Sequence, residues 1–247
     1  RGLKVTLVEV RPQVLPQMDH GMTEPLVTHL RRKKADVILG DGVISYEDDG
    51  QGRIQAVLLK SGRRIECGLV ITAVGVRQRI ALAREVGLKI GAAGGIVVDD
   101  HMRTSVADIY AAGDIVETIH LVTGESVKMP LAGPANKQGR VAGANAAGGN
   151  LSFPGVLGTM IVRVCDLTAA KTGLSESEAR AAGFDPLVSY THSSDHAAYY
   201  PGAETMMIKI VADRNDGRLL GAQIVGPKGV DKRIDVFATA LMGRMKV

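Results

Sequence analysis

The 247-residue sequence has no tryptophan, and aromatic residues make up only 3% of it. No indole is therefore available to stack on a nucleobase or on a cofactor ring. The two cysteines, Cys67 and Cys165, are far apart and form no CxxC pair. Both lie in apolar, strand-like stretches, so we expect them to be small buried residues, as free cysteines usually are. Unpaired thiols favour a reducing, cytoplasmic location.

Long apolar runs and blocks of like charge are also missing. No apolar run reaches the roughly 18 residues that indicate a membrane-spanning helix. The net charge is +4, with the two signs interspersed. One basic cluster, residues 31–34, lies on a predicted helix, where a solvated face is the simpler interpretation, because nucleic-acid binding calls for a larger basic stripe. We therefore expect neither a membrane nor a nucleic-acid partner.

Glycine is abundant instead, with 30 residues, which fits an α/β nucleotide-binding protein better than a β-sandwich. Residues 3–9 alternate and are rich in β-branched side chains, so they predict a strand that Glu9 closes. Residues 22–34 predict a helix. Two further stretches, 35–49 and 52–75, predict strands joined by glycine turns. The last of these strands is predicted to be buried, over residues 70–75.

The run TSVADIYAAGD, residues 104–114, is the most informative feature. Its apolar stretch 109–112 predicts a short buried strand that ends in Gly113 and Asp114. Open α/β sheets bind ligands at the carboxyl ends of their strands. Gly113 would let a ligand approach the backbone closely, and Asp114 could accept hydrogen bonds from sugar-like hydroxyls. The alternative is a strand followed by an aspartate that merely caps a helix.

A second candidate site is the helix predicted to begin near residues 131–135, after Pro130. The first turn of a helix presents free N–H groups and a partial positive charge, which suit the electron-rich edge of a ring. The small residues of this helix would also allow it to pack closely against a sheet, and that explanation stays open. Asn136 and Lys137 are candidates for substrate contacts, and an ordinary contact with solvent explains them equally well.

The composition changes near residue 150, and residues 151–247 predict an α+β unit. Its predicted elements are a strand over 160–166, a helix over 175–183, strands over 185–192, 204–213 and 218–226, and a helix over 231–241. Ser175 and Glu178 form a capping-box pattern, and Asp216-Gly217 predicts a hairpin turn. His192 and His196 are four residues apart, but their segment has no helical apolar stripe, so we expect no metal site.

These motifs together resemble the pyridine nucleotide-disulfide oxidoreductases over essentially the whole chain, in family order. PLAGPANKQGR, YYPGA and DKRID are similar to the branch that holds coenzyme A-disulfide reductases, NADH oxidases and NADH-dependent persulfide reductases. The implied fold is α/β, a partial FAD/NAD(P)-binding Rossmann-like core followed by an α+β dimerisation domain. Residues 1–75 would be the rear part of the NAD-binding domain, 76–150 the second segment of the FAD-binding domain, and 151–247 the dimerisation domain.

The resemblance implies two cofactors, FAD and NAD(P)H, and a set of residues that bind them. Asp114 would hold the ribityl chain of the flavin, and the helix start would face its ring. Glu9 would bind the adenosine ribose of NADH, since a carboxylate repels a 2′-phosphate. The implied cofactor-binding residues are Glu9, Gly75, Gly113, Asp114, Leu131, Ala132 and Ala135. Taken singly, Glu9 and Gly75 are equally consistent with an ordinary strand end and a turn.

The resemblance also implies a homodimer in which Tyr199 or Tyr200 of one subunit reaches the active site of the other. Coenzyme A disulfide or a persulfide would be the substrate, with Asn136 and Lys137 as candidate substrate contacts. Neither cysteine matches the redox cysteine of the family, which belongs to an N-terminal segment that this sequence lacks. We therefore expect the chain to be a fragment without reductase activity of its own. An oxygen-reducing NADH oxidase and a non-catalytic dimerisation module are the alternatives.

Overall fold

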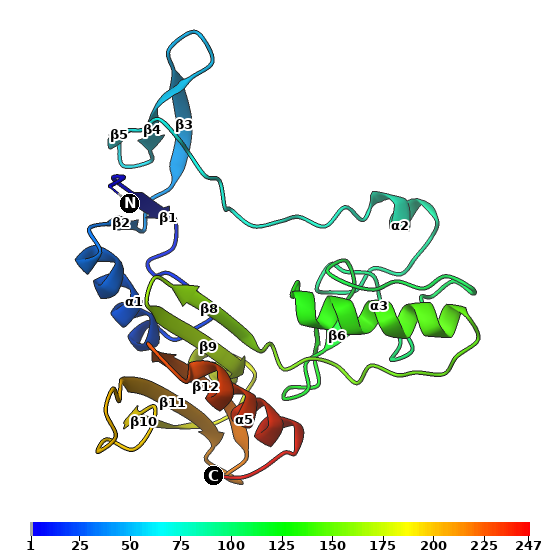
Figure 1. Ribbon diagram of the computed structural model, residues 1–247. Helices are drawn as coiled ribbons and strands as arrows, with labels where there is room; N and C mark the ends of the chain where they lie inside the picture. The colour runs from blue at the N-terminus through cyan, green and yellow to red at the C-terminus, as the bar shows by residue number, and fades with distance from the viewer. Residues whose placement is uncertain (1) are drawn as a thin grey trace.

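The computed structural model describes residues 2–247 (Figure 1). The chain forms an N-terminal unit, a middle segment built around helix α3, and a C-terminal unit of one sheet with helices. An extended stretch joins the first unit to the middle segment, and a second connection leads from α3 into the C-terminal sheet (Figure 1). The fold is mixed α/β, as the sequence predicts.

The N-terminal unit contains a small parallel β–α–β arrangement. Strand β1 (Thr6–Glu9) pairs in parallel with β2 (Asp36–Leu39), and α1 (His20–Arg32) connects them. The predicted strand is present, but it begins at Thr6 and not at residue 3, and its end at Glu9 is confirmed. A separate three-stranded antiparallel sheet comes next, made of β3 (Val43–Asp48), β4 (Ile54–Leu59) and β5 (Arg64–Glu66).

The buried strand predicted over residues 70–75 is wrong. Residues 67–80 contain no strand or helix. Leu69, Ile71, Val74 and Val76 are 74–89% exposed. The β-branched run has the propensity for a strand, but a strand also needs a hydrogen-bonding neighbour, and no segment of residues 2–247 pairs with it. The short helix α2 (Ala81–Glu85) comes next.

The middle segment has little regular structure apart from α3 (Ala132–Ala146) and a hairpin of β6 (Thr118–Ile119) and β7 (Ser126–Val127). The strand predicted over 109–112 is wrong, because this stretch makes a single bridge, between Arg103 and Tyr110. Its backbone is nevertheless half-buried. An apolar cluster holds the segment together on α3, with Met102, Val141, Phe153 and Val156 as its buried members.

The C-terminal unit is a five-stranded antiparallel sheet in the order β10-β11-β12-β9-β8. Its elements are β8 (Met160–Val164), β9 (Leu167–Gly173), α4 (Glu176–Ala181), β10 (Pro186–Ser194), β11 (Thr205–Asp213), β12 (Leu219–Gly226) and α5 (Val230–Met242). The predicted order of elements is confirmed except for β9, which the sequence did not indicate. This strand, LTAAKTG, consists of residues with low strand propensity apart from its threonines, and the sheet buries it almost completely.

Helices cover both faces of this sheet. Successive residues of a strand point to opposite faces. Ala170 and Ile224 pack with Ile234 of α5, whereas the neighbouring Ala169 and Val225 pack with α1 through a cluster that includes Met22. The N-terminal unit is therefore docked on the C-terminal sheet through the apolar face of α1.

Local sequence signals in the C-terminal unit agree with the structure, with one exception. The capping box of Ser175 and Glu178 begins α4 as predicted, with both of its hydrogen bonds present. The hairpin at Asp216-Gly217 joins β11 and β12. The predicted burial of Cys165 is wrong, because it is exposed in the β8–β9 turn with a φ of 55°. Cys67 is half-buried.

Among residues 2–247, no helix combines the length and apolarity needed to cross a membrane.

Candidate functional site

The turn at Gly113 and Asp114 packs against the beginning of α3. Gly113 has a φ of 86°, in the region that glycine adopts most readily. Its N–H donates a hydrogen bond of 2.9 Å to the side-chain oxygen of Gln138, which is 2% exposed on α3. A Cβ atom on Gly113 would lie 3.7 Å from the Cβ of Ala135. The structure thus brings together two features that the sequence indicates separately.

The carboxylate of Asp114 is exposed and makes no hydrogen bond or ion pair within the described chain. It caps no helix, because a turn comes after it and α3 begins much later, with Leu131 as its N-cap residue. The helix-capping alternative for Asp114 is therefore excluded. Asp114 is left as a free acceptor beside a backbone that a ligand can approach closely.

The first turn of α3 is open on its outer side. Its N-cap residue, Leu131, is extended and supplies no side-chain acceptor to the helix. Ala132, Asn136 and Lys137 are exposed, and Ala135 is half-buried against the Gly113 turn. The free N–H groups of this turn carry partial positive charge. A ligand that extends from Asp114 toward α3 would meet that charge without obstruction from large side chains.

Two buried residues that the sequence did not single out hold this region in shape. One is Gln138, the partner of Gly113. The other is Glu117, which is 4% exposed and accepts hydrogen bonds from the Ser126 hydroxyl (2.7 Å) and the Gly95 N–H (3.2 Å). Burial raises the pKa of Glu117, but these hydrogen bonds outweigh it and keep the pKa below its ordinary value. The sequence signal for Gln138 is its place in the PLAGPANKQGR motif, and Glu117 has none.

Replacing Gln138 with leucine is expected to destabilise the chain by about 1–3 kcal/mol, because the N–H of the half-buried Gly113 would lose its partner and the apolar side chain could not replace that bond. Arg140→Leu is the matched control, since Arg140 is exposed on the same helix. Urea unfolding measured by far-UV circular dichroism compares both. Equal midpoints for the two variants would contradict a structural role for the hydrogen bond between Gln138 and Gly113.

Glu9 lies at the carboxyl end of β1, opposite Leu39 at the end of β2. One carboxylate oxygen of Glu9 accepts a hydrogen bond of 2.8 Å from the N–H of Arg11. The other has no partner among residues 2–247, so it remains available to ribose hydroxyls. Gly75 has a φ of 86°, but nothing lies within 4 Å of the position of its Cβ. The structure does not bring Gly75 together with the other candidates.

Tyr199 and Tyr200 lie in the loop of residues 195–204 between β10 and β11 and are 91% and 66% exposed. They border a cavity of about 340 Å³ with His196, Ala197 and Pro201. This loop lies far from α3 in Figure 1, so within one chain the tyrosines and Asp114 do not form a common site.

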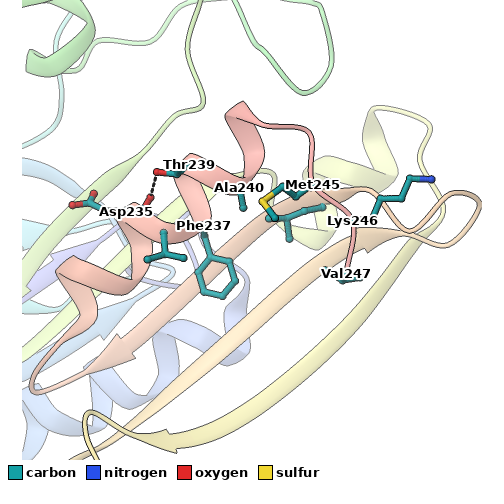
Figure 2. Close-up of a pocket in the computed structure, with 9 residues that line it drawn as sticks. Asp235, Phe237, Thr239, Ala240, Met245, Lys246 and Val247 are labelled. Carbon is teal, nitrogen blue, oxygen red and sulfur yellow. Dashed lines mark hydrogen bonds between the residues drawn. The ribbon is translucent and has the colours of Figure 1, made fainter.

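A larger cavity of about 480 Å³ lies beside α5 and the C-terminal residues (Figure 2). Its lining is mainly apolar, with Asp235, Thr239 and Lys246 as its polar members. Thr239 uses its hydroxyl locally, in a hydrogen bond of 2.9 Å to the backbone oxygen of Asp235. No cluster of three potential metal ligands occurs within residues 2–247.

The parallel β–α–β pair and the glycine–aspartate turn on a small-residue helix are features of a partial Rossmann-like α/β core, to which an α+β domain is added. Residues 1–139 match the family described as "Pyridine nucleotide-disulphide oxidoreductase", and residues 159–247 match its dimerisation domain. The chain belongs to this family of FAD-dependent oxidoreductases, which use NAD(P)H.

Similar proteins support the same assignment. The chain is 38% identical over 98% of its length to "NAD(P)H sulfur oxidoreductase (CoA-dependent)" of Pyrococcus abyssi, of which it covers 53%. It is 31% identical over its full length to "Coenzyme A disulfide reductase" of Staphylococcus haemolyticus, covering 54% of that protein. The solved structure of an NAD-dependent persulfide reductase from A. fulgidus superimposes with a TM-score of 0.93 at 40% identity, covering 99% of this chain and 45% of that one. The chain thus spans about half the length of the curated relatives it matches.

Proposed function

We propose that the chain forms part of a homodimeric flavoenzyme that passes electrons from NAD(P)H through FAD to a disulfide or persulfide such as coenzyme A disulfide. Residues 1–75 would contribute to NAD binding, 76–150 to FAD binding and 151–247 to dimerisation. The similar proteins, which include a coenzyme A disulfide reductase and a CoA-dependent sulfur oxidoreductase, support this acceptor class.

The observation that carries the proposal is the contact of the Gly113–Asp114 turn with the start of α3. Bound FAD would supply the chemistry, by taking hydride from NAD(P)H and delivering the two electrons to the disulfide or persulfide, which is thereby reduced to the thiol level. Asp114 would accept hydrogen bonds from the hydroxyls of the cofactor's sugar-alcohol chain. The N–H groups at Ala132 and its neighbours would stabilise negative charge on the ring edge, by about 0.3–1 kcal/mol.

The nicotinamide cofactor would be recognised at the other end of the chain. The free carboxylate oxygen of Glu9 suits the ribose hydroxyls of NADH and would repel the 2′-phosphate of NADPH. Asn136 and Lys137, exposed in the first turns of α3, are placed where substrate or nicotinamide could contact them. These assignments favour NADH as the electron donor.

The tyrosines would act across the dimer, since they lie away from Asp114 in their own chain. A phenol is a neutral donor near pH 7, so Tyr199 or Tyr200 could hold a proton next to a departing thiolate. Their exposure of 91% and 66% leaves both hydroxyl-bearing rings free to enter a partner's site. Tyr199, the more exposed of the two, is the stronger candidate.

The exposed segment 67–80 supports the idea that further chain completes the enzyme. The N–H of Cys67 still bonds to Gln55 of β4, but beyond it four large apolar side chains are 74–89% exposed along residues 69–76, a stretch that pairs with no strand within residues 2–247. Such an edge tends to be covered by another strand. We therefore place the remaining flavin-binding structure against this segment.

The test compares this chain with the full-length enzyme. The chain alone is expected to show no NADH-dependent reduction of coenzyme A disulfide, and the full-length enzyme is expected to carry a flavin absorbance band and to reduce the disulfide. Stopped-flow mixing of the reduced full-length enzyme with coenzyme A disulfide or with oxygen identifies the acceptor. Turnover by residues 1–247 would contradict the proposal, as would faster reoxidation by oxygen, and a colourless full-length protein would indicate a non-catalytic dimerisation module.

A further inference from the structure

The loop that carries the two tyrosines is closed at its base by reciprocal hydrogen bonds. β10 and β11 pair as far as Ser194 and Thr205. Beyond that pair, the N–H of Asp195 donates to the oxygen of Glu204 at 2.9 Å, and the N–H of Glu204 donates to the Oδ1 atom of Asp195 at 2.7 Å. The side chain of Asp195 is only 11% exposed. Its carboxylate therefore holds the two ends of the loop together and is not a free surface charge.

His196 connects Asp195 to the two tyrosines. Its Nδ1 atom lies 3.0 Å from the Oδ2 atom of Asp195, and its Nε2 atom lies 3.3 Å from the backbone oxygen of Tyr200. The two rings meet edge to face, with centroids 5.8 Å apart. Both ring nitrogens thus face oxygen atoms that can only accept. A neutral imidazole has one N–H and can satisfy one of them, whereas the imidazolium donates to both.

Arg233 joins the base of the loop, at Asp195, to α5. Its Nη2 atom donates to the backbone oxygen of Asp195 at 2.6 Å, and its Nη1 atom donates to the oxygen of Gly229 at 3.2 Å. Lys228, just before the helix, donates to the oxygen of Gly202 at 3.3 Å on the far side of the loop. The DKRID motif, which the sequence offers as a family marker only, thereby gains a physical role.

We propose that Asp195, His196 and Arg233 are positioning residues for Tyr199 and Tyr200, and that protonated His196 locks the tyrosine loop. The catalytic meaning of this inference rests on the proposed function, whereas the locking itself does not. The charged groups near His196 among residues 2–247 are Asp195 from the loop, Lys228 just before α5 and Arg233 in the first turn of α5. The hydrogen bond from Glu204 and the contact with His196 lower the pKa of Asp195, so its carboxylate stays ionised at neutral pH.

The direction in which pH changes the stability of the loop follows from the two acceptors that face the His196 ring, the Asp195 carboxylate and the Tyr200 backbone oxygen. The imidazolium is present at low pH and loses a proton as the pH rises. Deprotonation leaves one ring nitrogen facing an oxygen without a hydrogen, so one of the two bonds is lost. The loop should therefore be held more tightly below the pH at which His196 titrates than above it.

The experiment measures amide hydrogen exchange in the full chain by NMR, together with the titration of the His196 ring. After correction for intrinsic exchange, protection of the Tyr200 and Glu204 amides is expected to fall by about 5- to 10-fold as His196 deprotonates, as loss of one charge-assisted bond at a partly exposed site predicts. In His196→Gln this step should disappear, and protection should stay at the lower level. His192→Gln is the matched control, because His192 is exposed on β10, and it should behave as the unmodified chain.

A second variant distinguishes the loss of the His196 hydrogen bonds from a general loosening of the loop. Arg233→Gln should lower the protection at every pH but keep the pH step, because His196 and Asp195 remain. Protection that is independent of pH while His196 titrates, or a pH step that persists in His196→Gln, would overturn the inference.

The full-length enzyme separates this inference from the proposed function. His196→Gln is expected to lower kcat for disulfide reduction several-fold and to remove one limb of its pH profile, with KM for NADH unchanged, because Glu9 lies elsewhere in the chain. If Tyr199→Phe and Tyr200→Phe leave kcat unchanged, the proposed role of the tyrosines fails. In that case the pH step in exchange would still support the locking of the loop.

Discussion

Replacing Lys209 with methionine is expected to destabilise the folded chain by about 3–5 kcal/mol, the usual cost of removing one partner from a buried ion pair. Lys209 is on β11, and its side chain is 2% exposed. Its ammonium nitrogen lies 2.8 Å from the Oδ2 atom of Asp19 and 2.9 Å from the Oε2 atom of Glu176. Methionine fills a similar volume but would leave two carboxylates facing each other at a site that excludes most water.

The loss should be large because Asp19 connects three parts of the structure. It precedes α1 in the N-terminal unit, and its Oδ2 atom accepts a hydrogen bond of 3.0 Å from the N–H of Glu176, at the start of α4. Its own N–H donates to the side-chain oxygen of Gln223 on β12 at 2.8 Å. The cluster of Asp19, Glu176, Lys209 and Gln223 therefore fastens the N-terminal unit to the C-terminal sheet next to the apolar contacts of α1.

Urea unfolding gives the measurement, and Lys33→Met gives the matched control. Lys33 pairs with Asp166, but these side chains are 47% and 61% exposed, so losing the pair should change the unfolding midpoint little. The double variant Asp19→Asn/Lys209→Met should be less destabilised than the sum of the two single variants, since the residues share one interaction. A loss below about 1 kcal/mol for Lys209→Met would show that the cluster does not fasten the two units.

The stability that the Asp19–Lys209 ion pair contributes depends on pH through the pKa of each of the two residues. Burial raises the pKa of Asp19, but its hydrogen bonds with Lys209, Glu176 and Gln223 outweigh burial and lower it from 3.8. Stability from Asp19 is thus complete above its unfolded pKa and is lost as the pH falls through the lowered value. Burial lowers the pKa of Lys209, but bonds to Asp19 and other neighbours raise it above 10.5, so its contribution persists below that value and is lost at more alkaline pH. The cost of Lys209→Met should be constant between about pH 5 and 9.

Local signals in the sequence predicted local structure well. The capping box places the start of α4, the proline-flanked run of small residues places the start of α3, and the Asp-Gly pair places the turn between β11 and β12. Each of these depends on hydrogen bonds between residues close in sequence. The turn that carries Asp114 meets α3 through the hydrogen bond from the Gly113 N–H to Gln138, a bond that the sequence did not indicate, and the role of Asp114 in cofactor binding stays a prediction.

The elements that could not be predicted from the sequence depend on contacts between residues far apart in the chain. The stretches 70–75 and 109–112 have strand-like composition, but neither finds a ladder partner within the described chain. β9 shows the reverse, since neighbours on both sides make a strand of a segment with low propensity. It also buries a charge, because Lys171 pairs with Glu178 across the start of α4. Buried lysines such as Lys171 and Lys209 look like surface residues in the sequence, because their carboxylate partners become neighbours only after folding.

The Asp114→Asn substitution is expected to weaken FAD binding by the full-length enzyme by roughly 10- to 100-fold. This is the effect of losing hydrogen bonds to a charged acceptor. The Asp114 carboxylate has no partner of its own in the described chain and stands at the turn that Gln138 holds against α3. The amide keeps the size of the side chain but loses the charge and one acceptor. Flavin content after purification and a fluorescence titration of the apoenzyme with FAD measure the effect, with Asp100→Asn as the exposed control.

The same variant also separates a ligand-binding role from a structural one. Because Asp114 makes no hydrogen bond or ion pair within residues 2–247, Asp114→Asn should leave the stability of residues 1–247 to urea within about 0.5 kcal/mol of the unmodified chain. Gln138→Leu, in contrast, should lower stability and flavin binding together, since it loosens the turn that carries Asp114. A stable Asp114→Asn enzyme that keeps its full flavin content would show that this carboxylate does not hold the cofactor, and the site would then have to lie elsewhere on the α3 surface.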